Sequence, residues 1–229
     1  MDGPDQIEML AQEVRRQWGL DAGPVADVAA LMEGHGVLLA RPLLATRQVD
    51  AFSVAFEDHP VVLLGADKGK RDRSRFDAAH ELGHLVMHGP DYPQAEAERQ
   101  AQQFAAALLM PQRDIRNELP ARVDWNRLLA LKGRWGTSIA SLLYRARTLR
   151  VMKEPEYIRA SKGLSARGWR VDEPGNLGPP EAPRLLSEAV RLAEEAGHTL
   201  LDIASEAGVP PEELSLILVA AQPRPRLSL

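Results

Sequence analysis

The sequence predicts an α+β fold in which a small antiparallel sheet precedes a helix that carries two histidines. Three short apolar runs come first, at Val37–Ala40, Val49–Glu57 and Val61–Leu64, and an Asp-His-Pro turn separates the last two. The stretch Arg75–Gly89 follows, with apolar residues at helical spacing and glycine and proline at its end. Strands followed by helices, rather than alternating with them, are typical of an α+β domain.

The predicted helix contains the pattern His-Glu-Leu-Gly-His from His80 to His84. Residues four apart share one face of a helix, so both imidazoles can bind one metal ion at about 2.0–2.1 Å. Glu81 lies beside that position, where a carboxylate can take a proton from water at the metal. The alternative is a surface helix with two unrelated histidines, and chance produces this pattern in roughly one chain in two hundred of this length. The pattern therefore favours a catalytic metal site with Glu81 as general base.

A catalytic zinc ion needs a third protein ligand, and the next helical stretch, Glu96–Met110, offers two carboxylates. Glu98 lies one turn before the apolar face of that stretch and is the predicted ligand. Glu96 points about 200° away from it around the helix, so both cannot face one ion. His88 would lie about 12 Å from His80 along a continuous helix, which excludes a shared ion. We expect His88 to act at the helix end or to support the ligands.

Three stretches of this sequence resemble the ImmA/IrrE-like zinc metallopeptidases, over about residues 24–150. They are the run RFDAAHELGHLVMHG, the segment ERQAQQFA that begins at Glu98, and the Leu-Met-Pro that follows it. The resemblance implies a thermolysin-like (zincin) minimal catalytic domain in which His80, His84 and Glu98 bind Zn²⁺ and Glu81 is the base. Mn²⁺ is an alternative ion. The family usually has Asn where this chain has Gln102, so we expect a different contact there.

The resemblance also implies a protein substrate, because members of this family are known mainly for cleaving a partner transcriptional repressor, a DNA-binding protein. In zinc peptidases of this architecture an edge strand commonly pairs with the substrate backbone, and Asp50–Ser53 is the candidate here. Tyr144, on a helix expected to begin near Thr137 and Ser138, is a candidate donor to the oxyanion, as is Arg145. The alternative for these two is a boundary tyrosine and a surface arginine.

The chain divides into three expected segments. Residues 1–152 form the zinc metallopeptidase domain, 153–183 form a connector and Pro/Gly-rich linker, and 184–229 form a small helical C-terminal module. Within the first segment, helices are also expected over about 6–18 and 24–33. The cationic stretch 67–75 is expected to be a solvated loop rather than a nucleic-acid or repressor contact.

Composition limits the function classes. The 229 residues carry a net charge of -4, which gives no general attraction to nucleic acid. The chain has no cysteine, which excludes disulfides and cysteine-bound zinc and fits the cytoplasm. No apolar run approaches the roughly 20 residues of a membrane span, so no membrane partner is expected.

Two alternatives to the peptidase remain from the sequence. One is a non-catalytic regulatory binding protein that retains its zinc site, and the intact His, Glu, His and Glu set disfavours it. The other is a helix-turn-helix DNA-binding regulator, because the spacing over 203–217 matches that motif. The segment 210–220 has Glu212 and Glu213 but no Lys or Arg, so it would repel phosphates. Direct nucleic-acid binding is therefore not expected.

Overall fold

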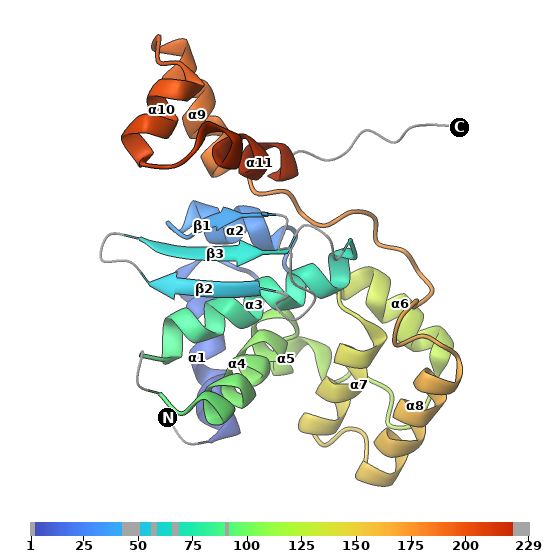
Figure 1. The fold of residues 1–229 in the computed structure, drawn as a ribbon. Helices are drawn as coiled ribbons and strands as arrows, with labels where there is room; N and C mark the ends of the chain where they lie inside the picture. Colours follow the sequence, from blue (N-terminus) through green and yellow to red (C-terminus); the bar gives the residue numbers. More distant parts are fainter. Residues whose placement is uncertain (1–2, 43–50, 56–58, 66–68, 90–91, 222–229) are drawn as a thin grey trace, which may run out of the picture.

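The computed structural model describes residues 3–42, 51–55, 59–65, 69–89 and 92–221 and has a mixed α+β fold (Figure 1). A small sheet lies over a group of helices, and a further set of helices follows near the C-terminus. In chain order the elements are α1 (Pro4–Gln17), α2 (Val28–Gly34), β1 (Leu38–Ala40), β2 (Ala51–Ala55), β3 (Pro60–Leu64), α3 (Arg71–Met87), α4 (Gln94–Leu109), α5 (Gln112–Ile115), α6 (Trp125–Trp135), α7 (Ile139–Thr148), α8 (Glu154–Ala166), α9 (Leu185–Glu195), α10 (Leu200–Ala207) and α11 (Pro211–Ala221).

The sheet has the strand order β1-β3-β2, and it is mixed rather than antiparallel. β2 runs antiparallel to β3, with Phe52 opposite Leu63, whereas β1 runs parallel to β3, with Leu38 opposite Val61. The prediction of an antiparallel sheet was therefore wrong for β1. The last strand in sequence, β3, is uniformly apolar and takes the central position in the sheet. β1 and β3 are therefore neighbours in the sheet although β2 lies between them in the sequence, and no hairpin joins them.

Helices α3 and α4 pack closely together, with α3 next to β2 and β3 and α1 on α4 (Figure 1). Gly83 permits the close approach of α3 and α4. A Cβ atom at this position would lie 3.1 Å from the Cα atom of Ala101 and 3.1 Å from Cδ1 of Phe104. Glycine thus lets the backbones meet at the turn of α3 that carries the two histidines.

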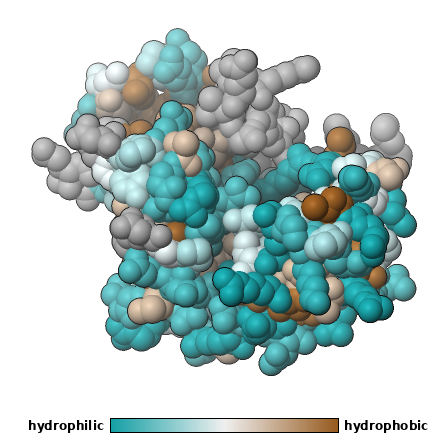
Figure 2. Space-filling model, turned by 90° about the horizontal axis from the view of Figure 1, so that it is seen from below, coloured by the Kyte–Doolittle hydropathy of each residue, from teal (hydrophilic) through white to brown (hydrophobic). Residues whose placement is uncertain are grey.

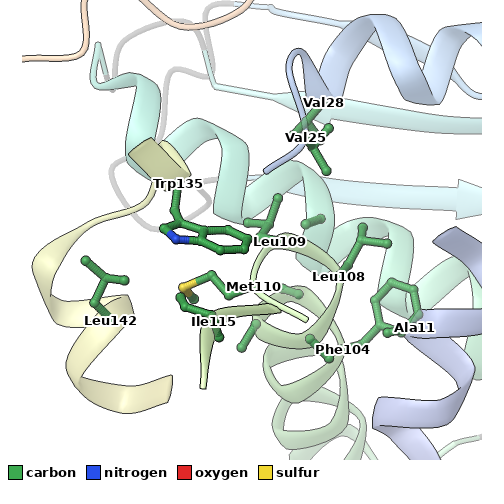
Figure 3. Packing of buried hydrophobic residues seen from close by; sticks show 14 of the residues in the cluster. Ala11, Val25, Val28, Phe104, Leu108, Leu109, Met110, Ile115, Trp135 and Leu142 are labelled. Atoms are coloured by element: carbon green, nitrogen blue, oxygen red, sulfur yellow. The ribbon is translucent and has the colours of Figure 1, made fainter. Parts of the chain in front are cut away.

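The hydrophobic core forms around the C-terminal half of α4, which is buried on nearly all sides. Figure 3 shows Phe104, Leu108, Leu109 and Met110 from this region together with apolar residues of other elements. The residues labelled from those elements are Ala11, Val25, Val28, Ile115, Trp135 and Leu142. Burial of such side chains contributes about 1.5–3 kcal/mol each and fixes α4 within the domain.

Two helix starts differ from the sequence-based prediction. α2 begins at Val28 rather than at Pro24, because the Asp27 side chain accepts a hydrogen bond from the Ala30 amide and caps the helix there. α3 begins at Arg71, inside the stretch expected to be a loop. The prediction of a cap before α7 is confirmed, since the Ser138 side chain accepts from the Ser141 amide.

Residues 167–184, which we call the connecting segment, have no helix or strand, as their proline and glycine content predicts. Two of its carboxylates are nevertheless buried against the helices. Glu173 accepts from Lys132 Nζ at 2.9 Å and from the amide of Ile139 at 2.9 Å. Glu181 pairs with Arg75 and accepts from the Val28 amide at 2.8 Å. The connecting segment is therefore anchored at two points.

The cations that begin α3 contact this same segment. Lys70, Arg71 and Arg73 donate to the backbone carbonyl oxygens of Val171, Pro179 and Arg170, in that order. The expectation of a loop was wrong from Arg71 onward, where α3 begins, whereas Lys70 precedes the helix and Asp67 and Lys68 lie outside the described residues. The three hydrogen bonds are solvent-exposed and satisfy carbonyl groups of a segment that lacks regular hydrogen bonding. The division of the chain at 152 and 183 stays a prediction.

The C-terminal helices α9, α10 and α11 contact one another, and α9 contacts β1. Figure 1 shows them at the side of the sheet where β1 and α2 lie. The entry to α9 is held by Glu33, which accepts from the amides of Arg184 and Leu185 at 2.9 Å each. Val190, Ala204 and Leu214 are the buried apolar residues of these helices in the part that the structure describes.

The molecular surface opposite these helices is mainly hydrophilic. Figure 2 shows apolar residues there only in small, separate groups. Among the described helices, none has both the length and the apolar character that crossing a bilayer demands.

Candidate metal centre

Helices α3 and α4 bring three side chains together. His80 and His84 lie one turn apart on α3, and their Nε2 atoms are 3.0 Å from each other. Glu98 on α4 places its two carboxylate oxygens 3.1 Å from Nε2 of His80 and 3.4 Å from Nε2 of His84. All three ligand atoms lie within 4.8 Å of one another, which is the arrangement of a group that could hold a metal ion.

These separations fit a small tetrahedral ion. Ligands about 2.0–2.1 Å from such an ion lie about 3.3 Å from each other, close to the three distances above. The donor set of two imidazole nitrogens and one carboxylate suits zinc and similar divalent ions. The histidine side chains are about one-fifth exposed, at 20% and 21%, and Glu98 is 54% exposed, so the group opens to solvent on the Glu98 side.

Glu81 follows His80 on α3, and its charge interacts with both His80 and Glu98. It is buried, and its Oε2 atom accepts a hydrogen bond of 2.7 Å from the hydroxyl of Ser53 on β2. Burial raises the pKa of the Glu81 carboxyl above its ordinary value, and the Ser53 hydrogen bond partly opposes that shift. A raised pKa brings a carboxylate closer to the range in which general bases work well.

His84 is suited to bind as a neutral imidazole. Burial lowers its pKa, and the neighbouring His80 lowers it further, while Glu98 acts in the opposite direction. Metal binding requires an imidazole nitrogen without a proton, so a lowered pKa favours the ligand form.

His88 is the C-cap residue of α3. It contacts Nδ1 of His84, whereas Glu98 lies near the other ring nitrogen, Nε2. The Nδ1 atoms of His84 and His88 are 3.1 Å apart. Nε2 of His88 lies 3.2 Å from Oε1 of Gln100 on α4. Glu96, the alternative carboxylate considered from the sequence, accepts from Arg99 Nε at 3.0 Å instead. Of these residues, only His80, His84 and Glu98 belong to the group that could hold an ion among the described residues.

The comparison with protein families bears directly on this centre. A model described as the IrrE N-terminal-like domain, of peptidase family M78, matches residues 32–147. The match covers just over half of the chain and includes α3 and α4 completely. The chain belongs to this peptidase family. A search of curated proteins finds no match.

Membership of the M78 family supports a metallopeptidase-type function and agrees with the resemblance seen in the sequence. The matched region ends near the end of α7, so α8 to α11 and the connecting segment lie outside it.

The two candidate oxyanion donors, Tyr144 and Arg145, differ in their surroundings. Tyr144 is half-buried on α7 and packs against the hydrophobic core, and burial raises the pKa of its phenol. Its role as an oxyanion donor stays a prediction. Arg145 is buried and donates to the Met110 carbonyl at 2.8 Å and to Glu8 at 2.6 Å, so it is a structural residue and not a surface arginine.

Sequence reasoning missed two residues that contact neighbours of the metal-binding group, Ser53 at Glu81 and Gln100 at His88. Ser53 lay within the candidate edge segment Asp50–Ser53, but its contact with Glu81 depends on how β2 lies against α3. Gln100 is buried, whereas Gln102, the position singled out from the family resemblance, is exposed. His88 follows the ligand His84 by four residues, which places both on one face of α3 and gave the only signal. Gln100 follows Glu98 by two residues, which lie on opposite faces of α4, so the spacing gave no signal for it.

Proposed function

We propose that this chain is a zinc-dependent endopeptidase that cleaves a partner DNA-binding transcriptional repressor and so switches on gene expression. The observation that carries the proposal is the convergence of His80, His84 and Glu98 within 4.8 Å beside a buried Glu81, in a chain of a peptidase family. His80, His84 and Glu98 would hold the zinc ion. A zinc ion there would supply Lewis acidity toward the scissile carbonyl and lower the pKa of water.

The remaining chemistry belongs to the side chains. Glu81 accepts the proton of the attacking water and then carries it to the departing amine nitrogen. Ser53 holds one oxygen of Glu81, which leaves the other oxygen to receive the proton. General acid–base catalysis of this kind typically contributes 10²–10⁴-fold to the rate.

The edge strand β2 supports a polypeptide substrate. Among the residues that the structure describes, β2 pairs with β3 alone, so its other edge can accept an extended segment by backbone hydrogen bonds. Ser53, which reaches Glu81, lies on this strand, so a segment paired with β2 would pass close to the base. Asp50, the first residue of the candidate segment, lies outside the described residues.

The test compares the parent with Glu81→Gln, which preserves the size of the side chain but cannot accept a proton. Each zinc-loaded protein is incubated with the DNA-binding repressor encoded beside it and, separately, with a peptide library made from a proteome. New amino termini are then counted by mass spectrometry over time. We expect cleavage by the parent, and cleavage at least about a hundredfold slower by Glu81→Gln.

A regulatory binding protein would behave differently. It would bind the repressor without producing new termini, and Glu81→Gln would relieve repression in a reporter assay as well as the parent does. That outcome would exclude the peptidase function.

A further inference from the structure

The Gln100 side chain has a fixed orientation because of its neighbours. It is buried, with 1% of its surface exposed, and its Nε2 atom lies 2.8 Å from a carboxylate oxygen of Glu96 and 2.9 Å from the Tyr92 hydroxyl. A carboxylate can only accept hydrogen bonds, so the amide NH₂ group of Gln100 must face Glu96. Arg99 donates to both oxygens of Glu96 and holds that carboxylate in place. The amide oxygen of Gln100 therefore faces His88.

This orientation determines which nitrogen of His88 carries the proton. Nε2 of His88 lies 3.2 Å from the amide oxygen of Gln100, which can only accept, so Nε2 must donate. In a neutral imidazole the other nitrogen is then an acceptor. That nitrogen, Nδ1, lies 3.1 Å from Nδ1 of His84. His84 must therefore donate from Nδ1, and its Nε2 carries no proton.

The bare Nε2 atom of His84 is the one that points at the metal centre, 3.0 Å from Nε2 of His80. The opposite order of donors would require the Gln100 amide oxygen to face the Glu96 carboxylate, two acceptors at 2.8 Å. It would also place a proton on the nitrogen of His84 that faces His80 and Glu98. The contacts at both ends of this row of hydrogen bonds, at Glu96 and at the metal centre, thus favour the same order of donors and acceptors.

We propose that Gln100 and His88 are positioning residues that fix the tautomer of His84, so that its Nε2 atom is free to bind the metal before the metal arrives. The inference rests on the metal centre of the proposed function. Packing restrains the same residues, since the rings of His84 and His88 lie 5.1 Å apart and those of His88 and Tyr92 lie 4.7 Å apart. Residues that orient a ligating histidine typically change metal affinity 10–100-fold when they are replaced.

The first measurement is the zinc dissociation constant of the full chain, obtained by competition with a chelator. His88→Gln removes the acceptor near His84, because its amide lies further along the side chain, whereas His88→Asn retains an oxygen close to the position of Nδ1. We expect His88→Gln and Gln100→Met to weaken zinc binding roughly 10–100-fold, and His88→Asn to restore most of the affinity. Tyr92→Phe is the matched control, since Glu96 still orients Gln100, and should bind like the parent.

The second measurement is the tautomer itself, read from ¹⁵N–¹H correlations of the histidine rings in the metal-free and zinc-loaded full chain. The parent and His88→Asn should show His84 protonated at Nδ1 in both states, and His88→Gln should show a mixture in the metal-free state. This measurement on the parent needs no variant to fold, and circular dichroism checks the folding of the others.

Two results would overturn the inference. One is a metal-free parent in which His84 carries its proton on Nε2. The other is a His88→Gln protein that binds zinc as tightly as the parent. If the tautomer and affinity results hold but no peptide is cleaved, the proposed peptidase function fails while the role of Gln100 and His88 stands.

Discussion

Ser53 on the edge strand β2 donates a hydrogen bond of 2.7 Å to Oε2 of Glu81 on α3. This contact links two parts of the proposed site. One is the strand with which an extended substrate could pair, and the other is the carboxylate that we propose as the base. It also gives a buried carboxylate a polar partner, without which burial would favour its protonated form more strongly. Ser53 thus both orients Glu81 and keeps it able to accept a proton.

Replacing Ser53 by alanine should therefore affect catalysis and leave the metal in place. A hydrogen bond to a charged group contributes about 1.5–3 kcal/mol, so we expect kcat/KM to fall by roughly tenfold to a hundredfold. Zinc content, measured by metal analysis, should match the parent. Ser53→Thr retains the hydroxyl and suits a strand, so it should keep most of the activity. Equal activity of the alanine variant and the parent would show that Glu81 needs no such partner.

Gly83→Val should destabilise the protein and disturb the centre together. The added side chain would meet the backbone of Ala101 at a point where even a Cβ atom is 3.1 Å away, and overpacking of this kind costs about 1–3 kcal/mol. We expect urea unfolding to show that loss, and zinc binding to weaken as α4 shifts with Glu98. Gly133→Val on α6 is the control, because a Cβ there meets nothing within 4 Å. Similar losses in both variants would argue against a specific contact of α3 with α4.

Glu181→Ala should release one anchor of the connecting segment. It leaves Arg75 buried without its charge partner and removes an acceptor from the Val28 amide, and breaking a buried pair typically costs about 3–5 kcal/mol. Limited proteolysis should then cut the segment much faster than in the parent. Asp172→Ala is the control, since its pair with Lys70 is solvent-exposed and such pairs contribute little to stability. Rapid cleavage of the parent itself within 173–183 would mean that these anchors do not hold.

The two helices of the metal centre, α3 and α4, could be predicted from local patterns in the sequence. Spacing of four residues puts His80 and His84 on one face wherever the helix lies, and the apolar stripe of Glu96–Met110 predicts α4 to within two residues of its ends. Glu98 precedes that stripe by one turn, so the side of α4 on which its side chain lies could also be inferred. Such features depend on helix geometry alone, and this is why they can be predicted.

Features that depend on contacts between distant segments could not be predicted in the same way. The pairing of β1 with β3 joins strands separated by a third, and no turn sequence signals it. Glu173 and Glu181 have no periodic context, so nothing in the sequence shows that they are buried against α7 and α2. The hydrogen bond from His88 to Gln100 depends on side-chain conformations and on the close approach at Gly83. The sequence therefore indicated which residues could bind a metal, but not how they are held.

Glu98→Ala should remove the metal from an otherwise folded chain. Only two protein ligands would remain, which is too few for a stable zinc site. We expect about one zinc per chain in the parent and a small fraction of that in the variant after dialysis, with unchanged circular dichroism. Glu13→Ala, which removes an exposed carboxylate paired with Arg16 on α1, controls for the loss of charge. Full zinc retention by Glu98→Ala would mean that another residue is the third ligand.

The most direct test of the metal centre is anomalous diffraction at the zinc edge from crystals of the zinc-loaded full chain. We expect one strong peak about 2.0–2.1 Å from Nε2 of His80, Nε2 of His84 and a carboxylate oxygen of Glu98, with His88 and Glu81 outside bonding distance. A peak bound by His88 or Glu81, or the absence of a peak between α3 and α4, would contradict the account.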